Sequence, residues 1–544
     1  MKGINLLWVT VVAVVLSGCQ EKGDSSTSKI PLFQSHFIGM TRIIQGTNAS
    51  KLKDVWALPA SLQVRKEALD KIATAPFRAW KKVLPSGAQE ASQLIRPLLD
   101  DLVASESVLE FNGAGADFDS VIAISLNEER SRVWNTNLWQ IATKWKLGSP
   151  RPLSNETPGW EVKGRIVTMR VLQAKEWLFV GWSRGKLKAI NLLAETAAKS
   201  GRPIASDAAL LDCKADFPSL SQHSALIGTF KLPVSHFVVS PHRDGESLRT
   251  EGLFSLERPL NWTFQPWQIP TEFISDPLVS FTVAQGIDSV LKAIPGIADL
   301  KLEKMPTQMC SWSQRQGSFQ NFWAFPSPNA STNVRRMTPE LEKLVKRYIP
   351  KPPGSLVYIT NKSEVVWQGL PLIIPSLTAK STKNTDYFLA SLFPIASRIK
   401  PPPQELLAQI EGRPDLRYYD WEITSDRVGN AKLLYQILDM IHLRTLLGTN
   451  APSVQWTDQA SGRLGNSVTE ITATSSPKEL KLVRKSHIGL TGFEVVTLLR
   501  WIDSPAFPLG YEPPPTLREL RERNSRKPGN LPIPPGSPIK TNRP

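Results

Sequence analysis

Residues 177–190 read WLFVGWSRGKLKAI, in which an apolar, strand-like run is followed by G-W-S-R-G and then by a helical pattern. A Ser on a sharp turn between a strand and a helix is the arrangement of a nucleophile elbow, where the Ser hydroxyl attacks an acyl group. Ser183 is therefore the candidate catalytic residue of the chain, and its chemistry would be that of a serine esterase.

The segment before this turn argues against an elbow. The nucleophile strand of an α/β-hydrolase lies in a parallel sheet, and parallel neighbours need a connection of about a dozen residues or more. Only LQAKE separates RIVTMRV (165–171) from WLFVGW (177–182), so these strands are predicted to form an antiparallel hairpin. His242 and His487 lie in no recognisable triad setting. We therefore interpret Ser183 as the N-cap of the following helix, with the nucleophile as the alternative.

Two polar stretches contain possible metal ligands. HFVVSPHRDGE (236–246) contributes His236, His242, Asp244 and Glu246. Their spacing matches no established zinc motif. NGAGADFDS (112–120) has Gly and Asp at positions like those of a calcium loop but lacks the alternating ligands and the distal Glu. We expect ordinary turns at both places, with no bound metal and no cofactor.

Two features bear on polysaccharide binding or cleavage. Carboxylate pairs for glycoside hydrolysis are not recognisable, because Asp100–Asp101 and Glu128–Glu129 are adjacent in predicted helices and point to different faces. The 17 Trp residues would suit a carbohydrate-binding module if their rings were exposed. Several of them instead follow apolar helix or strand patterns: Trp134, Trp139, Trp145, Trp177, Trp323 and Trp421. We expect most Trp side chains to lie in the core.

The N-terminus carries the most specific motif of the chain. Lys2 precedes an uncharged apolar stretch from Ile4 to Leu16, which is too short to span a bilayer comfortably but typical of an export signal. The stretch ends in Leu16-Ser17-Gly18-Cys19, which resembles the lipobox of bacterial lipoproteins. The resemblance implies that residues 1–18 are removed as a signal peptide and that Cys19 is lipidated. An ordinary secretory signal and an uncleaved anchor are the alternatives.

Charge and cysteine content are interpreted in that setting. A formal net charge of +16 would suggest nucleic acid in a cytosolic protein, but behind an export signal we expect anionic lipid or envelope polysaccharide instead. Gln20 after Cys19 favours the outer membrane, by the sorting pattern of diderm lipoproteins. Cys213 and Cys310 are the remaining thiols, which either form a disulfide or stay separate and buried. The sequence identifies no protein partner.

An order of elements recurs along the body. After a helical segment (51–105), a strand, a helix, a hairpin and a second helix follow one another three times, with first strands at 120–126, 278–285 and 416–424. A closing strand is predicted at 225–232 in the first copy and at 355–360 in the second. This order predicts an α+β protein of tandem antiparallel-sheet modules with β-α-β-β-α-β, or ferredoxin-like, order.

Two helix starts in this pattern carry their own signals. Thr338 followed by Pro339 predicts an N-cap and first helical position in the second copy. Thr491 and Glu494 form a predicted capping box in the third copy.

Composition suggests where the parts of the chain begin and end. We expect a lipidated Cys and tether over 19–50, a helical segment with the first module over 51–245, a second module over 246–400 and a third over 401–510. Residues 511–544 are rich in Pro and Arg and poor in large apolar residues, so we expect a disordered tail.

These observations favour a membrane-anchored cell-envelope lipoprotein with a non-catalytic binding or scaffolding role over an enzyme. The alternatives are an envelope hydrolase that uses Ser183 and a carbohydrate-binding module.

Overall fold

The computed structural model describes residues 31–525, with gaps. The residues left out within that range are 80–87, 114–117, 154–157, 166, 206–208, 217, 219–233, 258, 260–264, 294–295, 301, 316–319, 349–353, 371–372, 394–399 and 449. The lipobox, Cys19, Gln20, the predicted closing strand at 225–232 and residues 526–544 therefore lie outside the described residues.

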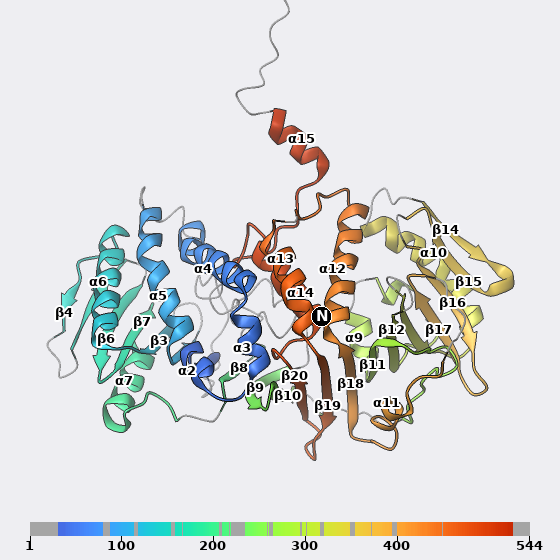
Figure 1. The fold of residues 1–544 in the computed structure, drawn as a ribbon, viewed down its shortest axis with the longest axis horizontal. Helices are drawn as coiled ribbons and strands as arrows, with labels where there is room; N and C mark the ends of the chain where they lie inside the picture. The colour runs from blue at the N-terminus through green and yellow to red at the C-terminus, as the bar shows by residue number, and fades with distance from the viewer. Residues whose placement is uncertain are drawn as a thin grey trace, which may run out of the picture.

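The described chain is an α+β protein built on one antiparallel sheet of 20 strands (Figure 1). The neighbouring strands of its first half, from the edge inwards, are β4 (Arg151–Pro152), β5 (Gly159–Lys163), β6 (Thr168–Ala174), β7 (Trp177–Ser183), β3 (Asp119–Ser125), β2 (Ser107–Asn112), β1 (Phe33–Phe37), β8 (Leu211–Asp216), β9 (Val234–Asp244) and β10 (Ser247–Leu256). The sheet continues through β20 (Glu479–Ser486), β19 (Asn466–Ala473), β18 (Leu416–Ile423), β11 (Leu278–Gln285), β12 (Gln308–Gln314), β13 (Gln320–Pro326), β17 (Asp386–Ser391), β16 (Ser376–Ser381), β15 (Glu364–Gln368) and β14 (Ser355–Ile359).

Helices cover both faces of this sheet. In chain order they are α2 (Met40–Gln45), α3 (Ser50–Trp56), α4 (Pro59–Ala79), α5 (Ser92–Ala104), α6 (Glu128–Lys144), α7 (Lys188–Ser200), α9 (Asp288–Ala293), α10 (Ala330–Tyr348), α11 (Gln404–Ala408), α12 (Thr424–Ile441), α13 (Pro452–Ala460), α14 (Gly492–Asp503) and α15 (Leu517–Ser525). Apolar side chains of α5 and α6 pack on one face of the β3–β7–β6 region, and those of α7 pack on the other. The apolar faces of α4, α12, α13 and α14 meet in one central cluster.

The C-terminal strands occupy the centre of the sheet. β10 pairs with β20, and β11 pairs with β18, so the strands of residues 416–486 join the N-terminal part to the middle part of the chain. Figure 1 shows these orange and red strands between the blue and green elements on one side and the yellow elements on the other. The predicted boundary at 245/246 lies in the turn between β9 and β10, so it does not separate two sheets.

The ferredoxin-like order is not confirmed. In the first copy β3, β7 and β6 are neighbours in the expected order, but β2 occupies the place of a closing strand beside β3. The second and third copies are meanders, β11–β12–β13 and β18–β19–β20. In the third copy the meander arises because a second helix, α13, follows α12. The chain thereby returns to the end of the sheet where β18 finished, and β19 starts there and pairs antiparallel with β18.

Two predicted details of the helix starts had different outcomes. The capping box is confirmed, since Thr491 N donates to Glu494 Oε2 (2.9 Å) and Glu494 N donates to Thr491 Oγ1 (3.4 Å). The N-cap at Thr338 is wrong, because α10 begins at Ala330 and continues through Pro339. The apolar face of α10 packs on the sheet on both sides of Pro339, which favours helix continuity.

The structure distinguishes the two alternatives for the cysteines, and it also describes the first residues of the predicted tail. Cys213 and Cys310 are free, and they are buried in separate apolar clusters on β8 and β12. The segment after residue 510 is structured over its first 15 residues, where Leu517 N donates to Leu443 O (3.0 Å) and α15 follows.

The start of α14 lies against the first turn of α12. A Cβ added at Gly492 would lie 2.9 Å from Arg427 Cβ and 2.9 Å from Val428 N, whereas one added at Gly429 of α12 would meet nothing within 4 Å. Gly492 therefore permits a close approach of the two helices, and Gly429 does not serve such a purpose.

We predict that Gly492→Ala lowers the free energy of unfolding by about 1–3 kcal/mol, because the helices must move apart to admit the methyl group. Gly429→Ala should raise it by about 0.5–1 kcal/mol, because Ala favours the helix interior. Urea denaturation of both variants measures the difference. Equal effects of the two substitutions would contradict the close approach at Gly492.

Candidate functional site

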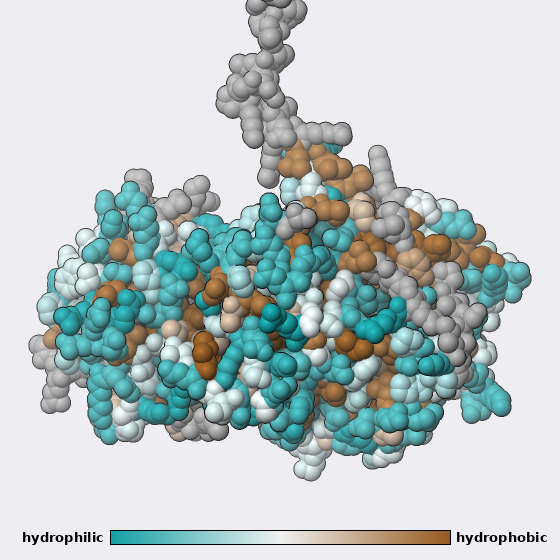
Figure 2. All heavy atoms as spheres, viewed as in Figure 1, coloured by the Kyte–Doolittle hydropathy of each residue, from teal (hydrophilic) through white to brown (hydrophobic). Residues whose placement is uncertain are grey.

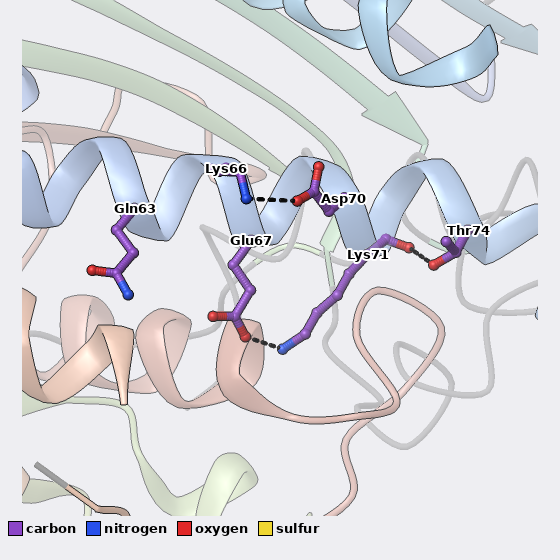
Figure 3. Close-up of a pocket in the computed structure, with 6 residues that line it drawn as sticks. All are labelled: Gln63, Lys66, Glu67, Asp70, Lys71 and Thr74. Atoms are coloured by element: carbon purple, nitrogen blue, oxygen red, sulfur yellow. Dashed lines mark hydrogen bonds and ion pairs between the residues drawn. The ribbon is translucent and has the colours of Figure 1, made fainter. Parts of the chain in front are cut away.

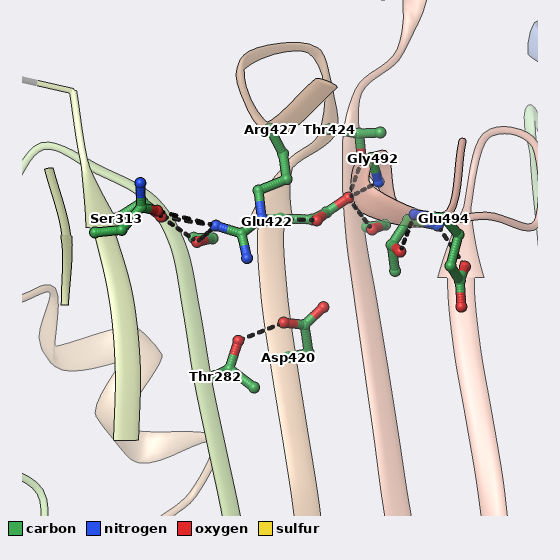
Figure 4. Close-up of polar contacts among 12 residues, drawn as sticks. Thr282, Ser313, Asp420, Glu422, Thr424, Arg427, Gly492 and Glu494 are labelled. Atoms are coloured by element: carbon green, nitrogen blue, oxygen red, sulfur yellow. Dashed lines mark hydrogen bonds and ion pairs between the residues drawn. The ribbon is translucent and has the colours of Figure 1, made fainter. Parts of the chain in front are cut away.

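Two rows of polar side chains cross the sheet on the face beneath the first turns of α12 and α14 (Figure 4). Antiparallel register places their members directly opposite one another, and alternation along each strand keeps them on one face. The first row is Asn321, Ser313, Ser280, Glu422 and Ser467, and the second is Thr282, Asp420, Thr469, Arg484 and Thr250. Most of these side chains are buried.

Glu422 is the centre of the first row and is only 2% exposed. Its Oε1 accepts three hydrogen bonds, from Gly492 N (2.7 Å), Thr424 Oγ1 (3.0 Å) and Ser467 Oγ (3.2 Å). Its Oε2 lies 3.9 Å from Arg427 Nε. One carboxylate thus connects β18 to β19 and to the first residues of α12 and α14.

Arg427 extends the network towards β12 and β13. Its Nη1 donates to Ser313 Oγ (2.8 Å), Ser280 Oγ (3.0 Å) and Asn321 Oδ1 (3.4 Å). Ser313 Oγ in turn donates to Asn321 Oδ1 at 2.5 Å. Figure 4 shows the Arg427 side chain reaching from α12 over the sheet towards Ser313.

Arg484 provides the matching connection on the other side. Its guanidinium forms a bidentate pair with Glu494, with Nη1 2.8 Å from Oε2 and Nη2 3.1 Å from Oε1. Nε donates to Thr469 Oγ1 (2.9 Å). Because Glu494 is also the acidic member of the capping box, Arg484 fixes the start of α14 to the sheet.

Burial shifts the acidities of this region. Burial first, and then the nearby Asp420 carboxylate, raise the pKa of Glu422 to about 7, against the opposing effects of the hydrogen bond from Gly492 and the charge of Arg427. The pKa of Asp420 is also raised by burial, although the hydroxyl of Thr282 donates to its Oδ1 at 2.5 Å. Burial likewise raises the pKa of Tyr418, which lies on the same strand.

The arrangement is suited to holding helices rather than to binding a substrate. Asp420 and Glu422 are alternate residues of one strand, and both are buried. The bonds of Glu422 go to groups of this chain, and Arg427 spans three strands. The network therefore joins α12 and α14 to the sheet at the place where the separate parts of the chain meet.

A hollow with a volume of about 390 Å³ lies along α4 (Figure 3). The described residues that line it come from α4: Gln63, Lys66, Glu67, Asp70, Lys71 and Thr74. Lys71 pairs with Glu67 (2.6 Å) and also donates to Ile502 O at the end of α14 (2.6 Å). Lys66 pairs with Asp70 (3.7 Å). These charges neutralise one another within a single helix, so the hollow gathers no convergent polar groups for a ligand.

Ser183 does not cap α7, so that interpretation is wrong. It is the last residue of β7 and is 1% exposed, and its Oγ accepts from Gly185 N (2.9 Å) within the turn. Asp119 instead caps the helix, since its Oδ2 accepts from Lys188 N (3.0 Å) and Ala189 N (2.8 Å). Asp119 lies directly opposite Ser183 in the β3–β7 pairing, which brings a distant side chain to the start of the helix. The burial that encloses Ser183 also disfavours its role as a nucleophile.

The possible metal ligands of 236–246 do not converge. His236 Nδ1 lies 3.2 Å from Ser235 Oγ, Asp244 pairs with Lys485 (3.2 Å) and Glu246 pairs with Lys51 (3.8 Å). Among the residues that the structure describes, no three His, Cys, Asp or Glu side chains form a group that could hold a metal ion. In the loop at 112–120, residues 114–117 lie outside the described part of the chain.

Three of the four adjacent carboxylates named above are in ion pairs. Asp101 accepts from Arg130 (2.7 Å) and from Trp134 Nε1 (2.8 Å), while Asp100 pairs with Arg96. Glu128 pairs with Arg132 across one helical turn (3.5 Å).

Most described Trp side chains are buried or half-buried, as expected. Trp139 is the exposed one within the described ranges, and its ring packs edge-to-face on Trp160 with centroids 5.4 Å apart. One ring of this kind does not form an aromatic platform.

Sequence reasoning missed Asp420, Glu422, Arg427 and Arg484. The signal was present in LRYYDWEIT, where Asp and Glu alternate with aromatic residues in a strand. That pattern is also typical of a strand with one solvent face, so it did not indicate burial.

No protein-family model matches the chain, and neither does any curated protein or any solved structure.

We predict that Ser183→Asp lowers the free energy of unfolding by about 3 kcal/mol or more, because it buries a carboxylate directly opposite Asp119. Ser183→Ala should lower it by only about 1 kcal/mol, the typical net value of one hydrogen bond. Guanidinium denaturation separates the two. A wild-type stability for Ser183→Asp would restore the N-cap interpretation.

We also predict that stability falls as pH rises through the acidic range. The pKa of Glu422 is raised from 4.5 to about 7 in the folded protein. Between these two pH values the folded protein holds a proton on Glu422 that the unfolded chain has released. The stabilisation is fully present below about pH 4.5, and the free energy of unfolding falls by about 1–3 kcal/mol as the pH rises to 7.

Glu422→Gln should remove most of this pH dependence, measured by urea denaturation between pH 4.5 and 7.5. Glu342→Gln is the matched control, because Glu342 pairs with Lys346 on the exposed face of α10. An unchanged slope in Glu422→Gln would mean that another group causes the pH dependence.

Proposed function

We propose that the chain is a lipid-anchored protein of the bacterial cell envelope, with a non-catalytic binding or scaffolding role. The observation that carries this proposal is the sequence Leu16-Ser17-Gly18-Cys19 behind an uncharged apolar stretch. The acyl groups on Cys19 would hold the body at a membrane, because each buried methylene adds about 0.8 kcal/mol to membrane binding. Gln20 supports the outer membrane as the destination.

The body supports a scaffolding role through its architecture. One sheet runs through all the described parts of the chain, and its buried charges bond to groups of the same chain. The described residues contain no helix that is long and apolar enough to cross a bilayer.

The alternatives rest on weaker observations. An esterase would have to use Ser183, whose hydroxyl is buried and bonded within its own turn. A carbohydrate-binding module would have to use exposed aromatic rings, of which Trp139 is the described example.

The test of the anchor is Cys19→Ser expressed in a diderm bacterium. We expect the acyl mass to disappear from the N-terminal peptide and the protein to remain as precursor or leave the carbonate-washed membrane fraction. Gly18→Ala is the control, because it keeps a small residue before the cleavage site and should preserve lipidation. If Cys19→Ser kept the mature mass and the membrane fraction of the unsubstituted protein, the proposal would be wrong.

A further inference from the structure

Four exposed leucines gather at one end of the molecule, where α12 ends and the chain leads into α15. Leu438, Leu443, Leu446 and Leu517 are between 39% and 68% exposed, and we call them the apolar end. Figure 2 shows brown, hydrophobic surface gathered where α15 leaves the body. A contiguous apolar patch of this kind marks a contact with a partner or a membrane more often than a scattered leucine does.

The backbone holds these leucines in place. Leu517 N donates to Leu443 O (3.0 Å), Thr445 N donates to Pro515 O (3.0 Å), and Arg444 forms a β-bridge with Thr516. In the same part of α12, Ile437 and Ile441 are buried in one cluster with Ile373. The apolar end is therefore a built part of the fold.

Leu443 is the most informative of the four. It follows the C-cap of α12 and has φ +51°, a left-handed conformation that is unfavourable for any residue with a Cβ. Gly is the usual residue at this position because it adopts the conformation without strain. The chain instead keeps a large apolar side chain there and exposes it, which indicates that the side chain itself is used.

Positive charge accompanies the leucines. Arg444 and Arg518 each lie next to one of them in the chain, and Arg518 pairs with Glu522 (2.9 Å) at the surface. Residues 511–525 contain three Arg and three Glu, and residues 526–544 add four Lys and Arg without an acidic residue. Leucines that insert at the headgroup level and basic residues that contact phosphates are the combination by which proteins bind anionic membranes.

We propose that the apolar end lies against the surface of an anionic phospholipid bilayer. Leu443 and its neighbours insert between the headgroups, and Arg444 and Arg518 contact lipid phosphates. This contact adds to the proposed anchor and rests on it only in that lipidated Cys19 brings the body to the membrane. It would fix the orientation of the body, which a tether alone leaves free.

The test places a fluorophore at the apolar end of the lipidated full-length protein. Leu443→Cys is labelled with the environment-sensitive probe NBD, and the labelling is selective because burial raises the pKa of both Cys213 and Cys310 thiols far above the usual range. Leu192→Cys is the matched control, since Leu192 is a 63% exposed leucine on α7. Both proteins are reconstituted into vesicles of phosphatidylglycerol and phosphatidylethanolamine, and into vesicles of phosphatidylcholine.

We expect a severalfold rise and a blue shift of NBD emission at position 443 in the anionic vesicles, a smaller rise in phosphatidylcholine and no change at position 192. An NBD443 signal that stays aqueous while the protein floats with the vesicles would overturn the bilayer contact and leave the anchor intact. Failure to float would instead overturn the anchor. A signal that falls when protein is diluted at constant lipid would indicate contact between two copies of the chain and would also overturn the proposal.

Discussion

The structure depends on the hydrogen bonds of one buried carboxylate. Glu422 accepts bonds from the backbone of α14, from a hydroxyl of α12 and from a hydroxyl of β19, while it projects from β18. No apolar contact could join these elements with the same directional specificity, because the bonds fix both distance and angle. Arg427 and the Arg484–Glu494 pair repeat the arrangement on either side.

Such a network is a constraint as much as a source of stability. Buried ionisable groups lose hydration, so they are tolerated only where their partners are in register. If β18 shifted by one residue, Asp420 and Glu422 would move to the opposite face of the sheet and Trp421 would take their place. Both carboxylates would then lie against Phe281 and its apolar cluster. The polar rows thus specify which strands may join at the centre of the sheet.

The sequence predicted local features well and pairings poorly. The β6–β7 hairpin follows from its short connection, and the capping box at Thr491 follows from residues three positions apart. The cap of α7 could not be predicted in this way, because its acceptor, Asp119, is 69 residues from the N–H group of Lys188. The meanders were missed for a similar reason, since periodicity predicts a strand but not its neighbour. In the candidate site, alternation in β18 was visible, but burial of its carboxylates depends on helices that pack there only in the folded chain.

The insertion of β18, β19 and β20 between β10 and β11 affects how the protein folds during its synthesis. When residue 400 leaves the ribosome, β10 and β11 have both been made, yet the strands that pair with their open sides have not. Each of the two earlier parts therefore carries an unpaired sheet edge until the last third of the chain arrives. Such edges invite intermolecular pairing. Holding chaperones would shield these edges during that interval, and slow synthesis of the C-terminal third would increase aggregation.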